Sequence, residues 1–208
     1  MAEPRIEYLQ GEEIGQRFEQ IAALRLRVFN EWPYLYEGTM DEERYFLGFY
    51  LKAPQALAIT VVDGDELVGL STAMPLTDES PRIQQPFIDA GFDIERVFYL
   101  AESILLPEYR GRGYYRHFFE AREQHALSCG DYEWATFCTV MRDPDHPRRP
   151  ADYQPLDPIW EHFGYTRRSE LIAYYPWQDM DEAEETSKPL VFWLKRLADA
   201  GTRVASGR

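Results

Sequence analysis

Apolar and polar positions along the chain follow two different spacings, which predict strands and helices in a mixed order. Residues 5–10 alternate as a half-buried strand does, whereas residues 12–32 repeat apolar side chains every three or four positions and predict a helix. Proline and glycine interrupt the pattern at 32–38. A second helix is expected after this break, over 41–53, because it opens on an Asp-Glu-Glu run and stops before Pro54.

The central part of the chain predicts strands around one long helix. Two β-branched apolar runs within 56–76 flank Asp-Gly-Asp, which predicts an antiparallel hairpin. Residues 97–106 are apolar on both faces, as in the middle of a sheet, and residues 132–141 form a similar run. The helix predicted over 114–129, which closes at Gly130, connects them, so we expect these two strands to be parallel.

The remaining segments are polar or short. Residues 77–96 form a proline-broken insertion, which we interpret either as a binding or lid loop or as an ordinary surface excursion. After a charged, proline-rich loop, the pattern predicts a short helix and two closing strands with an exposed acidic connection. These segments are, in order, 142–157, 158–164, 169–177 and 188–197, with the acidic connection at 178–187.

Composition limits the class of protein. The 208 residues suit one α/β domain over 1–208, with a frayed tail from about residue 198. Without an apolar run of about 18 residues or a signal-peptide pattern, we expect a cytoplasmic protein that does not enter the membrane. A net charge of −14 argues against nucleic acid or an anionic membrane as partner. Oligomeric state stays open, with a homodimer among the options.

The segment "LLPEYRGRGYYRHFF", residues 105–119, leads from a strand through two glycines into a helix. Free N–H groups at a helix N-terminus bind phosphate, and glycines let the backbone approach closely. A nucleotide-triphosphate loop would need a Lys after the glycines, and none follows. A dinucleotide loop would need a third glycine where Arg116 stands.

The same loop, "RGRGYY", resembles the [QR]xxGx[GA] signature of the GNAT superfamily of acyl-CoA-dependent N-acetyltransferases. Arg110 and Gly113 match its first two fixed positions, whereas Tyr115 replaces the third, small residue. The order of predicted elements over about 5–196 also resembles this superfamily. The resemblance implies a mixed central sheet with splayed parallel central strands, flanked by helices.

The resemblance further implies an acetyl-CoA site that uses no metal. Backbone groups around Leu105 would pair with the pantetheine arm, and the signature loop would hold the pyrophosphate. The implied contacts of the loop are Arg110, Gly111, Arg112, Gly113, Tyr114 and Tyr115. A Tyr at position 115 fits only with its ring turned away from the diphosphate, and we predict that orientation.

Glu102 is the candidate general base, because the amine must lose a proton before it attacks a thioester. It lies on a central strand beside the expected thioester, and partial burial can raise the pKa of a carboxylate. The alternative is a structural carboxylate paired with an arginine. The proton donor is open: Trp160 stands where many members have Tyr, and the candidates are Tyr115, Tyr153 and Tyr165.

Aromatic residues crowd into the N-terminal quarter, and by resemblance Trp32, Tyr34 and Tyr36 lie where the acceptor enters. A packed turn is the alternative. We therefore predict an N-acetyltransferase that uses acetyl-CoA and a small-molecule or peptide amine. A second hypothesis is a non-catalytic CoA-binding or regulatory module. Two departures from the superfamily favour it: Trp160, and the lack of the Asn that often follows the fifth strand in its members. A plain protein-interaction domain would leave the glycine-arginine loop without a role.

Overall fold

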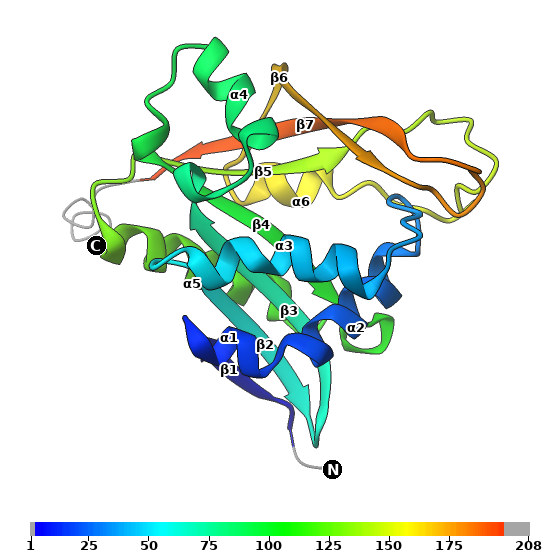
Figure 1. Cartoon of the computed structure of the whole chain (residues 1–208), viewed down its shortest axis with the longest axis horizontal. Helices are drawn as coiled ribbons and strands as arrows, with labels where there is room; N and C mark the ends of the chain where they lie inside the picture. The colour runs from blue at the N-terminus through cyan, green and yellow to red at the C-terminus, as the bar shows by residue number, and fades with distance from the viewer. Residues whose placement is uncertain (1–2, 198–208) are drawn as a thin grey trace.

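The strands form a seven-stranded mixed sheet in this computed structural model, which describes residues 3–197. The strand order is β1-β2-β3-β4-β5-β7-β6, and β4 with β5 is the parallel pair among antiparallel neighbours (Figure 1). The strands are β1 (Arg5–Leu9), β2 (Leu57–Asp63), β3 (Glu66–Pro75), β4 (Val97–Leu105), β5 (Trp134–Val140), β6 (Thr166–Trp177) and β7 (Thr186–Arg196).

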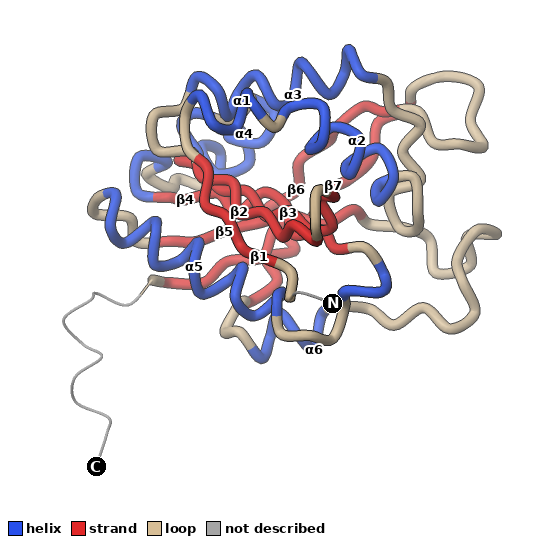
Figure 2. Tube along the Cα trace, turned by 90° about the horizontal axis from the view of Figure 1, so that it is seen from below, coloured by secondary structure: helices blue, strands red, loops and turns tan. Residues whose placement is uncertain are grey.

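Helices cover both faces of this sheet. Figure 2 shows α1 to α4 on one side of the strands and α5 with α6 on the other. The helices are α1 (Glu12–Gln16), α2 (Phe18–Phe29), α3 (Met40–Lys52), α4 (Pro81–Asp89), α5 (Tyr114–Cys129) and α6 (Asp157–His162). Three short 3-10 turns are also present: η1 (Leu76–Asp78) before α4, η2 (Ile94–Arg96) before β4 and η3 (Pro107–Tyr109) before α5. None of these helices is long and apolar enough to cross a membrane.

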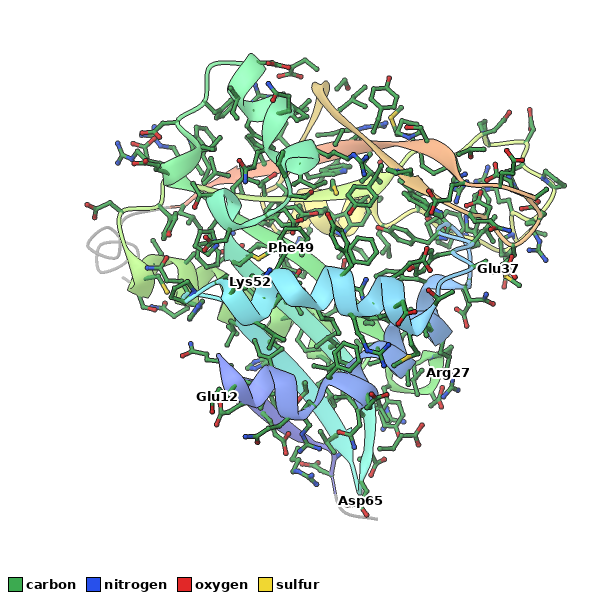
Figure 3. The ribbon with its side chains drawn as sticks, in the orientation of Figure 1. Glu12, Arg27, Glu37, Phe49, Lys52 and Asp65 are labelled. Atoms are coloured by element: carbon green, nitrogen blue, oxygen red, sulfur yellow. The ribbon has the colours of Figure 1, made fainter. Side chains whose placement is uncertain are left out.

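Local sequence signals explain where several elements begin and end. A capping box starts α3, because the Thr39 hydroxyl accepts from the Glu42 N–H while the Glu42 carboxylate accepts from the Thr39 N–H. The β2–β3 hairpin turns at Gly64, whose φ of 61° suits glycine. Figure 3 shows Asp65 at the tip of this hairpin.

The predicted fold class and element order are confirmed, with two corrections. The helix expected over 12–32 is divided at Arg17 into α1 and α2; Arg17 pairs with Glu7 of β1 at 2.8 Å. The connection 178–187 is not exposed throughout, because Asp179 is buried, where it forms an ion pair with Arg142. The tail expected to fray from about residue 198 lies outside the described residues.

Candidate functional site

The two central parallel strands separate soon after they pair. Val97, Phe98 and Tyr99 of β4 lie in register with residues 134–136 of β5, and beyond Tyr99 the two strands have no further pairs. β5 continues alongside β7 to its end, and β4 continues alongside β3. An opening therefore develops in the middle of the sheet, next to the carboxyl half of β4, which is the splay that the resemblance implied.

The loop between β4 and α5 has the backbone geometry of an anion site. Gly111 and Gly113 adopt φ values of 74° and 89°, which favour glycine, and a Cβ at either position would meet no atom within 4 Å. Gly113 is the N-cap of the 16-residue helix α5, and no described side chain caps this helix. Its first N–H groups therefore have no side-chain partner among the described residues, and the space in front of the glycines is open.

The arginines of this loop have mixed environments. Arg110 donates from Nε to the carbonyl of Leu105 at 3.1 Å and so fastens the loop to the end of β4. The Arg112 guanidinium lies over the ring of Tyr109, at 5.1 Å from its centroid, and Arg112 is exposed. Arg110 is also exposed, but its guanidinium lies 3.6 Å from Glu31, whereas the ion pairs of the described residues do not include Arg112.

Tyr115 turns away from the loop, as the sequence predicted. Its hydroxyl accepts a hydrogen bond from the indole N–H of Trp160 at 2.8 Å, and its ring packs edge-on against Phe119 at 5.3 Å. These contacts lie between the sheet and helices α5 and α6. Burial raises the pKa of Tyr115, and the Trp160 N–H acts in the opposite direction.

A β-bulge sets the direction of Glu102. Two residues of β4, Leu100 and Ala101, lie opposite the single β3 residue between Thr72 and Met74. A bulge turns the strand and re-aims its side chains. The buried guanidinium of Arg122, on α5, donates to the carbonyl of Glu102 at 2.8 Å and to that of Thr72 at 3.3 Å, so it satisfies backbone groups at this irregularity.

The Glu102 carboxylate is held by an arginine from α2. Arg25 donates to one oxygen, Oε1 of Glu102, and its Nε donates to the carboxylate of Glu43 on α3. The three side chains are 13%, 6% and 0% exposed for Glu102, Arg25 and Glu43. The other Glu102 oxygen, Oε2, is buried and has no hydrogen-bond partner among the described residues. One oxygen is thus anchored and the other is available.

Glu102 faces a cavity of about 150 Å³ on the side of the sheet covered by α2, α3 and α4. Eight of its fifteen lining residues are aromatic, including Tyr34, Tyr36, Tyr99 and Trp177. Both β4 and β5 contribute to it, so the cavity lies at the opening between these strands. Aromatic rings between α3 and β6 surround it. Figure 3 shows side chains crowded between these two elements, above the helix that carries the labelled Phe49 and Lys52.

Two further titratable groups line this cavity. Burial raises the pKa of Glu79, against the opposing effect of its hydrogen bond from the Ser80 N–H. Burial also raises the pKa of the Cys138 thiol to about 12, and this thiol lies 3.1 Å from the Tyr99 hydroxyl. At neutral pH Cys138 is therefore a thiol and not a nucleophilic thiolate, which disfavours an acyl-cysteine route.

The predicted acceptor residues divide between two places. Tyr34 and Tyr36 line the cavity, whereas Trp32 packs against His146 and Tyr153 with ring centroids 5.2 and 5.9 Å away. Arg142 holds this segment by donating to the carbonyls of Pro33 and Tyr34. The Arg142 guanidinium also pairs with Asp179, an ion pair that the sequence did not reveal.

The remaining tyrosine candidates differ in surroundings. Tyr165 donates to Glu123 at 2.9 Å under α5, and burial raises its pKa well above the usual value. Tyr153 lies in the loop before α6 and contacts Trp32. Ligand atoms of His146, Asp179 and Asp181 lie within 4.8 Å of one another, but Asp179 already pairs with Arg142, and we assign no metal there.

Sequence reasoning missed several residues of the cavity. Arg25 lies on a helix whose apolar spacing hid it, as does its partner Glu43 outside the cavity, and Glu79 lies in the polar insertion. Tyr175 and Trp177 come from β6, far along the chain. The one available signal was the unusual aromatic content of 15%, which does not say which rings meet.

Comparison with known proteins identifies the fold. By sequence, no protein-family model and no curated protein matches the chain. Solved structures do match. A protein of Desulfovibrio desulfuricans described as a GNAT-family acetyltransferase is 13% identical, with a TM-score of 0.56, and the match covers 93% of this chain and 100% of that one. Arabidopsis thaliana NAA60, in complex with a bisubstrate analogue, is 11% identical, with a TM-score of 0.58 over 94% and 100% of the two chains.

An aminoglycoside 6'-N-acetyltransferase complexed with coenzyme A is 18% identical, with a TM-score of 0.54, and the match covers 93% of this chain and 97% of that one. These matches extend over nearly the whole length of each protein, although few residues are identical. Similarity at this level is evidence for the fold and not for the reaction. The chain has the GNAT fold.

Proposed function

We propose that the protein is an acyl-CoA-dependent N-acyltransferase that moves an acetyl group from acetyl-CoA to an amine. The observation that carries this proposal is the position of Glu102. Its free oxygen lines a cavity at the opening between β4 and β5, and the uncapped N-terminus of α5 follows β4 directly. An acyl donor and an acceptor would meet where these features come together.

In this proposal the signature loop holds the donor. The N–H groups of Gly111, Arg112, Gly113, Tyr114 and Tyr115 bind the pyrophosphate, and the backbone around Leu105 binds the pantetheine arm. Arg110 acts by fastening the loop, because its Nε is bonded to the Leu105 carbonyl. The solved relatives bound to coenzyme A and to a bisubstrate analogue support a CoA-type ligand for this fold.

Glu102 is the proposed base. A proton leaves the amine for Oε2 of Glu102, the amine nitrogen forms a bond to the thioester carbonyl carbon, and the bond from that carbon to sulfur breaks. The CoA thiolate takes up a proton as it leaves. Trp32, Tyr34 and Tyr36 are proposed to guide a small-molecule or peptide amine into this site, Tyr34 and Tyr36 as part of the cavity wall.

Isothermal titration with acetyl-CoA tests the donor site. We expect binding at millimolar ligand or below, weakened about tenfold or more in Arg112→Glu because the reversed charge repels phosphate. Arg167→Glu, an equally exposed charge reversal on β6, is the matched control and should leave the affinity unchanged. Absence of acetyl-CoA and CoA binding would overturn the proposal.

Release of CoA with a panel of amines then tests catalysis. Chromatography is the suitable assay, because the free cysteines Cys129 and Cys138 would react with a thiol reagent. Glu102→Gln should abolish release and retain acetyl-CoA binding. The Arg25–Glu102 ion pair favours a second candidate, a CoA-binding module without catalysis, and binding without release for any amine would support it.

A further inference from the structure

The cavity beside Glu102 has the size of one small ring. It measures about 150 Å³ and is walled mainly by aromatic side chains. An apolar cavity of about this volume accepts benzene. A single ring with a short side chain would fill this space, whereas only one end of a long polycation or an oligosaccharide could enter it.

One carboxylate oxygen next to the cavity has no partner within residues 3–197. Arg25 is shared between two carboxylates, Glu43 and Glu102, and all three side chains are buried or nearly so. Oε2 of Glu102 has no hydrogen-bond partner among the described residues, and Glu102 lines the cavity. A buried carboxylate oxygen without a partner is costly, so a cationic N–H donor fits this position.

The walls also favour a cation that carries an apolar group. The faces of tyrosine and tryptophan rings attract ammonium groups, and Tyr99, Tyr175 and Trp177 all line the cavity. Besides Arg25 and Glu102, the ionisable wall residues outside the tyrosines are Glu79 and Cys138. An aminoglycoside or a polyamine spreads several cations over a longer molecule, whereas the two carboxylates of this wall, Glu79 and Glu102, lie within one small space.

On the basis of the proposed function, we infer that the acceptor is a primary amine on a short chain attached to a single aromatic or apolar ring. The ammonium docks on Oε2 of Glu102, and the ring lies among the aromatic walls. Glu102 takes one proton from the ammonium, the freed amine forms the amide bond, and the carbon–sulfur bond of the donor breaks. The nitrogen loses its second proton to water, the departing thiolate takes one from the proton donor of the site, which recovers it from water, and Glu102 returns its proton to water.

Titration calorimetry in the presence of CoA tests this inference without relying on turnover. The probe is 2-phenylethylamine; 2-phenylethanol keeps the ring without the charge, and propylamine keeps the charge without the ring. We expect 2-phenylethylamine to bind about tenfold or more tightly than either, because each control loses the ionic or the aromatic contact. Spermidine and kanamycin are the polycationic and sugar-based competitors.

Two substitutions on neighbouring residues locate the ring. Tyr175 lines the cavity and is 9% exposed, whereas Tyr174, next to it on β6, is 61% exposed. Tyr175→Ala should weaken 2-phenylethylamine about tenfold, and Tyr174→Ala should leave it within about twofold. Glu102→Gln should remove the preference for the amine over 2-phenylethanol while acetyl-CoA still binds.

The outcomes separate this inference from the proposed function. Binding and acetylation of spermidine or kanamycin in preference to 2-phenylethylamine would overturn the inference and leave the acyltransferase intact. Equal effects of Tyr175→Ala and Tyr174→Ala would also overturn it. Ring-amine binding that depends on Glu102, without any CoA release, would support the inference and overturn the proposed catalysis.

Discussion

Replacing Arg25 by Met tests whether the buried ionic cluster holds the site together. The substitution keeps a long aliphatic side chain and removes the guanidinium. Arg25 lies between Glu43, whose side chain is 0% exposed, and Glu102, which is 13% exposed. The Arg25 guanidinium also lies over the rings of Phe29 and Phe46, at 5.0 and 5.6 Å from their centroids. Without it, two buried carboxylates lose their shared cation.

The expected loss in free energy of unfolding is large. Removing one partner of a buried ion pair costs about 3–5 kcal/mol, because the remaining charge stays buried and uncompensated. A domain is stable by about 5–15 kcal/mol in total. Arg25→Met should therefore remove a substantial part of the stability. Arg25→Met combined with Glu43→Gln should recover some of the loss, because it removes one of the two orphaned charges.

Urea unfolding at pH 7, followed by the fluorescence of the five tryptophans, measures the effect. Arg27→Met is the matched control on the same helix. Arg27 is 57% exposed, lies 3.6 Å from the exposed Glu66, and is labelled on α2 in Figure 3. Such a surface pair contributes about 0–1 kcal/mol. If Arg25→Met were no more destabilising than Arg27→Met, the reasoning about the buried cluster would be refuted.

Three further substitutions test other features. Gly113→Ala should lower the free energy of unfolding by about 1–2 kcal/mol and weaken the binding of acetyl-CoA, because φ is 89° at Gly113. The control Gly48→Ala, inside α3, should not destabilise the protein. Equal urea midpoints for the two variants would contradict this prediction. Burial raises the pKa of Glu79, so the folded state holds the protonated carboxyl at low pH and loses stability as the pH rises and the buried carboxyl ionises. Glu79→Gln should therefore become more stable than wild type towards pH 8. Parallel curves of unfolding free energy against pH for the two proteins would count against this prediction. Tyr115→Phe should lower kcat on the order of 10²-fold and leave the Kd of acetyl-CoA unchanged. Trp160→Phe, which removes the hydrogen bond to the Tyr115 hydroxyl, should lower kcat less. An unaltered kcat for Tyr115→Phe would exclude Tyr115 as the proton donor.

The sequence predicted the order of the elements because local signals mark them. Each signal depends on residues only a few positions apart. Examples are the apolar period of two in strands or of three to four in helices, the proline and glycine breaks, and Gly130 at the end of α5. The glycine loop was recognisable for the same reason, since its proposed role depends on backbone conformation. The orientation of Tyr115 was predicted from the resemblance, because a large ring has no room beside the diphosphate that the resemblance implies.

The cavity could not be predicted in the same way, because its contacts join distant parts of the chain. Arg25 and Glu102 are 77 positions apart, and the residues between them include a hairpin and the insertion. The bulge that aims Glu102 depends on the register between β3 and β4, which no local pattern specifies. Glu102 was identifiable as a carboxylate in a central strand, but not as one with a single anchored oxygen.

In the proposed reaction, a Trp at position 160 is compatible with catalysis. The reason is that the two proton transfers would take place on opposite faces of the sheet. The amine would give up its proton in the cavity under α2, α3 and α4, where Oε2 is free. The thiolate would receive a proton on the side of α5 and α6, where the indole N–H of Trp160 orients the Tyr115 hydroxyl. Under this proposal Trp160 would position the proton donor instead of supplying the proton, so an ionisable side chain at position 160 would not be required.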